Sequence, residues 1–141
     1  MSSSLVVLAA FIAWTLLLLI VMEVIRSTLV MRGKVPANGF SPDNAGLSPF
    51  MQRLARAHAN CIEGLPIFGG MLLIAVVADL AHLTDPLAYV FLAARIVQSL
   101  IHLYSISPSA VTLRFSAFAV QLVIAVYWAS ALLMALIDAA G

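Results

Sequence analysis

The sequence is poor in the residues that mark most soluble proteins. Only 9% of its 141 residues are charged and 64% are hydrophobic. In a typical soluble domain, about 25% of the residues are charged and about 45–50% are apolar. Cys61 is the single cysteine, which rules out an internal disulfide, and no CxxC, HExxH or glycine-rich phosphate loop occurs. The net charge of +1 supplies no basic field for nucleic acid. We therefore expect no metal and no nucleic acid, and a lipid environment for the apolar surface.

Four apolar runs are long enough to cross a bilayer as helices, which takes about 20 residues. They extend from about Leu5 to Val30, Leu54 to Ala81, Pro86 to Ser105 and Val111 to Ile137. The first run lacks the basic start and the clear cleavage site of a signal peptide, so we interpret it as a retained span. Residues 1–141 are therefore expected to form a single all-α transmembrane domain.

The three connections between these runs differ in length. The first, MRGKVPANGFSPDNAGLSPFMQR, is rich in turn-forming residues and is predicted to be a loop of roughly 20 residues. The second, HLTDP, offers Thr84 or Asp85 as a cap for the next helix, with Pro86 in its first turn. The third, SISPS, offers Ser107 or Ser109. Short connections join antiparallel neighbours, so we predict an up-down four-helix bundle.

Basic residues are unevenly distributed among the connections. Those near the first and third connections are Arg32, Lys34, Arg53, Arg56 and Arg114. The second connection and the C-terminal end carry acidic residues instead, namely Asp79, Asp85 and Asp138. The positive-inside rule then places the first and third loops in the cytoplasm and both termini outside it.

Polar side chains interrupt three of the apolar runs at helical spacing, so that each forms a stripe on one helix face. The stripes comprise Arg56, Asn60 and Glu63 on the second span, Arg95, Gln98 and His102 on the third, and Arg114 and Gln121 on the fourth. All three begin near the cytoplasmic end. Because lipid cannot satisfy these groups, the stripes are expected to face protein or a wet cavity.

A purely structural interpretation of these charges is the alternative. Arg56 and Arg114 can extend to the headgroups, and Glu63 and Arg95 can form an ion pair that holds the bundle together. We favour a functional site, because ionisable residues inside a membrane are costly and usually mark function. Glu23 and Arg26, by contrast, have the i, i+3 spacing of a structural pair on the first span.

The second span also carries a recognisable motif. The segment RLARAHANCIEGLPIF resembles the signature of the MAPEG superfamily, the membrane-associated proteins of eicosanoid and glutathione metabolism. The resemblance lies in the pattern Arg56-x-x-x-Asn60-x-x-Glu63-x-x-Pro66-x-Phe68, with Arg95 and Arg114 fitting later positions. It covers nearly the whole chain. The first loop, with Phe40, Pro42 and Asp43, is similar to bacterial members, which implies the inner membrane of a bacterium.

The resemblance implies a homotrimer that binds glutathione between adjacent subunits near the cytoplasmic face. The expected glutathione contacts are Arg32, Arg56, Asn60, Glu63, Arg95, Gln98, His102 and Tyr104. Arg26 is the alternative to Arg32 for the first-helix arginine. The family often has a tyrosine at the position of His102, and here Tyr104 lies close by.

Elementary chemistry agrees with that ligand. Arginine binds carboxylates through its planar fork, Glu63 suits the ammonium group, and Asn60 suits the peptide. Arg114 is the candidate catalytic residue, because a nearby cation lowers the pKa of a thiol. The sequence thus predicts a glutathione S-transferase, with peroxidase activity as a possible addition, that acts on hydrophobic electrophiles. A non-catalytic lipid-presenting scaffold and a small proton-coupled exporter are the alternatives.

Overall fold

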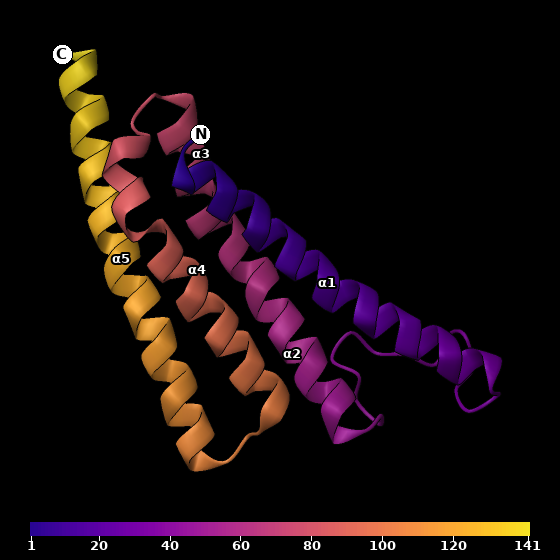
Figure 1. Ribbon diagram of the computed structural model, residues 1–141. Coiled ribbons are helices and arrows are strands. Elements are labelled where there is room, and N and C mark those ends of the chain that lie inside the picture. Colours follow the sequence, from indigo (N-terminus) through magenta and orange to yellow (C-terminus); the bar gives the residue numbers. More distant parts are fainter.

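The computed structural model describes residues 1–141 and is entirely helical outside its loops (Figure 1). The helices are α1 (Ser3–Met31), α2 (Pro49–Gly64), the π-helix η1 (Leu65–Gly69), α3 (Gly70–Val77), α4 (Ala81–Tyr104) and α5 (Pro108–Ala140). Because α2, η1 and α3 are continuous, they form one span, and the chain has four helices long and apolar enough to cross a membrane. The predicted class, an all-α membrane protein of four spans, is confirmed.

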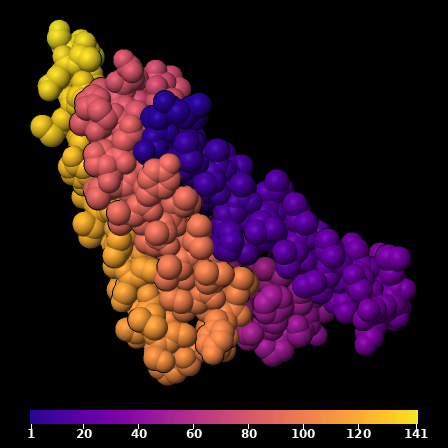
Figure 2. Space-filling view, in the orientation of Figure 1, coloured from indigo at the N-terminus to yellow at the C-terminus, as the bar shows by residue number.

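The four spans run alternately up and down, with α4 in the middle (Figure 1). Both termini and the α3–α4 turn lie at one end, whereas the long loop and the α4–α5 turn lie at the other. Helix α4 packs against α1, α2, α3 and α5, and its side chains fill the space between α5 and α1 (Figure 2). The helices spread apart toward the long loop. This divergence separates α2 from α5 toward the long loop.

Four aromatic side chains, one from each span, join the bundle at its centre. Phe91 of α4 lies 5.7 Å from Phe11, 5.0 Å from Phe68 and 5.6 Å from Trp128, measured between ring centroids. All four side chains are buried. Tilted pairs at such distances each add about 0.5–1.5 kcal/mol beyond burial. The cluster therefore fixes the spans relative to one another next to the polar stripes.

The second connection differs from its prediction. Helix α4 begins at Ala81, so Thr84, Asp85 and Pro86 lie inside it. The Asp85 carboxylate accepts hydrogen bonds from the backbone N–H and the hydroxyl of Ser4, at 2.8 and 2.7 Å, and so ties down the start of α1. Pro86 is tolerated because its missing N–H costs only one bond near the helix start. The prediction that Thr84 or Asp85 caps α4 was therefore wrong.

The third connection follows the prediction, since the Ser107 side chain accepts a hydrogen bond from the N–H of Ala110 and caps α5.

Within the second span, the predicted helix is interrupted at η1. Pro66 has no N–H to donate, and the chain widens there into a π-helix. Such widened turns are frequent at functional sites.

Residues 32–48 form the predicted loop, and one side chain of α1 holds it in place. Arg26 donates to the side-chain oxygen Oδ1 of Asn44 through Nε, at 3.0 Å, and also through Nη2. Through the same Nη2, Arg26 donates to the backbone carbonyl of Ser41 at 3.1 Å. Its Nη1 pairs with Glu23 at 3.2 Å, so the predicted Glu23–Arg26 pair is present. Asn44 is fully buried, and its Nδ2 donates to the Met51 carbonyl at 2.7 Å. Arg26 is therefore committed to the loop.

Candidate functional site

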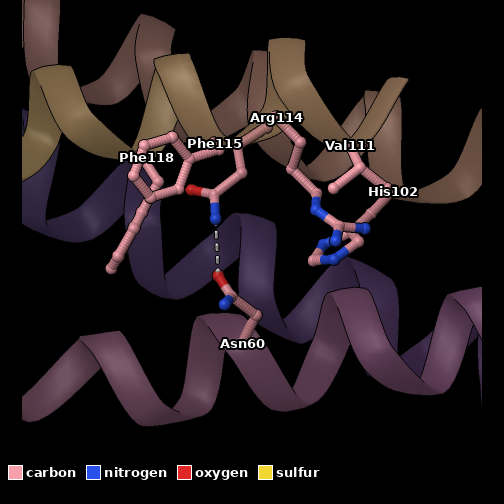
Figure 3. A pocket seen from close by; sticks show the side chains of 7 residues that line it. Asn60, His102, Val111, Arg114, Phe115 and Phe118 are labelled. Atoms are coloured by element: carbon pink, nitrogen blue, oxygen red, sulfur yellow. Dashed lines mark hydrogen bonds between the residues drawn. The ribbon is translucent and has the colours of Figure 1, made fainter. Parts of the chain in front are cut away.

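The three polar stripes meet at Asn60 of α2. Its Oδ1 accepts hydrogen bonds from Arg95 Nη1 and from Gln98 Nε2. The bond from Gln98, at 3.1 Å, is the dashed line in Figure 3. Gln98 Oε1 in turn accepts from Gln121 Nε2 of α5 at 2.8 Å. Side chains of α2, α4 and α5 are thus linked directly inside the bundle, where the stripes were expected to face protein or a cavity.

Two adjoining cavities, which we call the groove, open beside this network and share Asn60 and Phe118. The polar cavity has a volume of about 230 Å³ and is also lined by Gln98, His102, Val111, Arg114 and Phe115. The more apolar cavity, of about 250 Å³, is also lined by Glu63, Gly64, Ile67, Phe68, Arg95, Leu122 and Ala125. In the polar cavity, Arg114 of α5 and His102 of α4 point toward one another (Figure 3). The groove therefore combines a more polar part with a more apolar part, and both parts contain charged side chains.

Arg95 is a buried cation without a carboxylate partner. Its side chain is only 1% exposed, and its guanidinium carbon lies 5.4 Å from the ring centroids of Phe11 and Phe68. Its Nε has no hydrogen-bond partner. Burying an unpaired charge is costly, and the aromatic faces compensate for it only in part. The site therefore has the electrostatics of a receptor for an anionic group.

Gly64 makes this position of Arg95 possible. A Cβ atom on Gly64 would lie 2.9 Å from Arg95 Nη2 and 3.2 Å from Phe68 Cδ2. Gly64 was not predicted from the sequence to be part of the site. The available signal was a glycine directly after Glu63 in a span, where glycine weakens a helix and so needs a reason.

Glu63 is exposed at the groove and makes neither a hydrogen bond nor an ion pair; Glu23–Arg26 is the one ion pair of the chain. The structural alternative, in which Glu63 pairs with Arg95, is therefore wrong. Arg95 Nη1 donates to Asn60 Oδ1 instead. The Glu63 carboxylate remains free to bind a cationic group.

Three of the predicted contacts lie outside the groove of one chain. Arg56 lines a separate cavity of about 80 Å³ beside Arg53, next to the α4–α5 turn. Arg32 is exposed at the end of α1, and Tyr104 is 85% exposed at the end of α4. Asn60, Glu63, Arg95, Gln98, His102 and Arg114 are brought together. Ligand contact by any of these residues stays a prediction.

A family model described as "MAPEG family" matches residues 4–134, a range that includes the whole groove. No curated protein and no solved structure matches the chain.

Proposed function

Because this chain belongs to the MAPEG family, an integral-membrane family that includes glutathione transferases, we propose that it is a membrane-bound glutathione S-transferase. The observation that carries the proposal is the groove, where the cations Arg95 and Arg114 face a cavity without any carboxylate partner of their own. A small anionic thiol peptide supplies the missing anions. We place the groove near the cytoplasmic face, with both termini outside.

One carboxylate, the ammonium group and the peptide of glutathione each have a counterpart at the groove. Its two carboxylates suit guanidinium groups, which bind them in a bidentate manner, and Arg95 is the buried one. Its ammonium group suits the free carboxylate of Glu63, and its peptide oxygen suits the unbonded Nδ2 of Asn60. We assign Arg32, Arg56 and Tyr104 to complete the site across the subunit boundaries of a homotrimer.

Arg114 is the catalytic residue of the proposal. A free thiol has a pKa of about 8.5, and a guanidinium group beside it favours the thiolate. The thiol gives its proton to water, the sulfur then attacks an electrophilic carbon, and the leaving group departs with the electron pair of the broken bond. A lipid hydroperoxide instead takes two electrons from two glutathione molecules, which yields an alcohol, water and glutathione disulfide. Apolar substrates enter from the bilayer along the side of Leu122 and Ala125.

A conjugation assay tests this function. With glutathione and a chlorodinitrobenzene electrophile, Arg114→Ala is expected to lower kcat by about a hundredfold, the size of effect seen when one preorganised electrostatic donor is lost. Glu63→Gln is expected to raise the KM for glutathione by about tenfold or more, as for a lost charged hydrogen bond. Ser130→Ala serves as the control, because Ser130 is exposed on α5 and bonds only its own helix. Equal activity in all four proteins would exclude the mechanism.

One observation favours a second function. A proton-coupled exporter needs an acidic side chain free of arginine partners, and Glu63 has none. That function predicts pH-driven substrate flux in proteoliposomes, abolished by Glu63→Gln, with no conjugation. A lipid-presenting scaffold, the other alternative, predicts glutathione binding without turnover.

A further inference from the structure

We propose that Gln121 and Gln98 are positioning residues that lock the Asn60 amide with its NH2 group facing the groove. The identity of the ligand rests on the function proposed above, but the orientation of the amide does not. The three side chains form a chain of hydrogen bonds from α5 through α4 to α2, and both ends of this chain have a fixed polarity.

The first end is a backbone carbonyl on α5. Gln121 Nε2 donates to the Ala117 carbonyl at 3.1 Å and also to Gln98 Oε1 at 2.8 Å. A carbonyl oxygen can only accept, so the Gln121 amide cannot rotate by 180° without opposing oxygen to oxygen. The Gln98 oxygen is thereby directed at Gln121, and its nitrogen at Asn60.

The second end is Arg95, whose guanidinium group can only donate. Arg95 Nη1 and Gln98 Nε2 both approach the same atom, Asn60 Oδ1. Two donors from different directions require oxygen there, and so the Asn60 Nδ2 must lie on the other side. That nitrogen makes no hydrogen bond within the chain, and Asn60 lines both cavities of the groove.

The network is maintained at a cost, which supports a functional reason for it. Gln98 and Gln121 are 3% and 0% exposed, and Gln121 Oε1 is buried without a partner. A buried unsatisfied acceptor is unfavourable and calls for an explanation. In return for this cost, Asn60 presents two fixed N–H donors to a ligand carbonyl or carboxylate oxygen.

A thermodynamic cycle tests the coupling, with glutathione affinity measured by calorimetry. Gln121→Met is expected to weaken binding between about twofold and tenfold in the native background, the range for one neutral hydrogen bond. In an Asn60→Ala background it is expected to have no further effect. An equal loss in both backgrounds would overturn the proposal. Ser99→Ala is the matched control, since Ser99 is buried next to Gln98 but contacts Cys61 instead.

A spectroscopic measurement tests the orientation without any ligand. The chain has three asparagines, Asn38, Asn44 and Asn60, so protein labelled with ¹⁵N-asparagine gives three side-chain amide pairs, and Asn60→Asp identifies the third. Gln121→Met is expected to shift the Asn60 pair and Ser99→Ala to leave it in place. An unmoved Asn60 pair would overturn the proposal, and Gln98→Met gives the same test if Gln121→Met does not fold. If the native protein binds no glutathione while the Asn60 pair shifts as expected, the proposed function fails and the positioning role stands.

Discussion

Two regions of the molecule each pair an arginine with an asparagine, and the two pairs are completed differently. At the long loop, Arg26 donates to the side-chain oxygen of Asn44, and the side-chain nitrogen of Asn44 donates to the Met51 carbonyl. At the groove, Arg95 binds Asn60, but the Asn60 nitrogen has no partner. Arg26 also has the carboxylate of Glu23, whereas Arg95 has no carboxylate at all.

The difference separates a structural polar cluster from a binding site. Buried polar groups in proteins are almost always satisfied, and the Arg26–Asn44 cluster conforms to this rule. The Arg95–Asn60 cluster departs from it at Arg95, whose buried Nε has no partner. The half-buried Asn60 in addition leaves its Nδ2 without a partner beside the same cavity. We infer that the second cluster is completed by a ligand and the first by the protein itself.

The largest effect is expected from removing each arginine in turn. Arg95→Met should weaken glutathione binding by about a hundredfold, which corresponds to about 3 kcal/mol for lost charged hydrogen bonds. Arg26→Met should change affinity by less than about twofold but lower the thermal midpoint, because it releases the loop. Calorimetry and thermal denaturation measure the two effects. A reversed pattern, with Arg26 controlling affinity, would remove the distinction between the clusters and make Arg26 the first-helix ligand.

The second prediction concerns the Arg95–Asn60 cluster, which we call the open cluster; the Arg26–Asn44 cluster is the closed cluster. The substitution tested here completes the open cluster with a protein side chain. Asn60→Asp gives Arg95 a carboxylate partner and replaces the free donor with an acceptor. Glutathione affinity is expected to fall by about thirtyfold, because a donor to the ligand is lost and a negative charge is added. Thermal stability is expected to stay equal or rise, since the buried guanidinium is now paired. A variant that keeps full affinity would show that the Asn60 nitrogen does not touch the ligand.

The sequence allowed much of the fold to be predicted, because the physical signals for it are local. Four apolar runs of sufficient length give four spans whatever their packing. The helix ends are harder to predict from the sequence, because a helix end depends on which partners compete for a polar side chain. Asp85 shows this, as it binds Ser4 of α1 rather than capping its own helix.

The site was predicted only in part for a related reason. Periodicity shows which residues share one helix face, and it grouped Asn60 with Glu63 and Arg95 with Gln98. Periodicity does not determine how deep one helix lies in the bundle or how it is rotated relative to its neighbours. Those quantities decide that Arg95 meets Asn60 rather than Glu63, and that the Arg95 guanidinium group lies against Gly64.

The third prediction concerns the closed cluster and its backbone. Asn44 has a left-handed backbone with φ of 58°, so Asn44→Ala loses the side-chain bonds and also introduces strain. It is expected to destabilise the protein by about 2 kcal/mol. Asn44→Gly loses the same bonds without the strain and should recover about 0.5–1 kcal/mol of that loss. Equal thermal midpoints for the two variants would show that the backbone conformation is not constrained.

The smallest effect is expected from Asp43, which lies beside Asn44 in the loop. Its carboxylate accepts hydrogen bonds from the Ser41 hydroxyl and, at 3.0 Å, from the Ala45 N–H, and these hold the pKa of Asp43 below its ordinary value. A lowered pKa means that the charge stabilises the loop above the ordinary pKa of about 3.9, and that this contribution is lost as the pH falls through the folded-state pKa. Hydrogen exchange at Ala45 should therefore be slower in the native protein than in Asp43→Asn by a factor of about two at neutral pH. The two rates should converge in acid, where both side chains are neutral. A ratio that stays constant with pH would show that the loop is held by the Arg26–Asn44 contact alone, which would make the contrast between the closed and the open cluster sharper still.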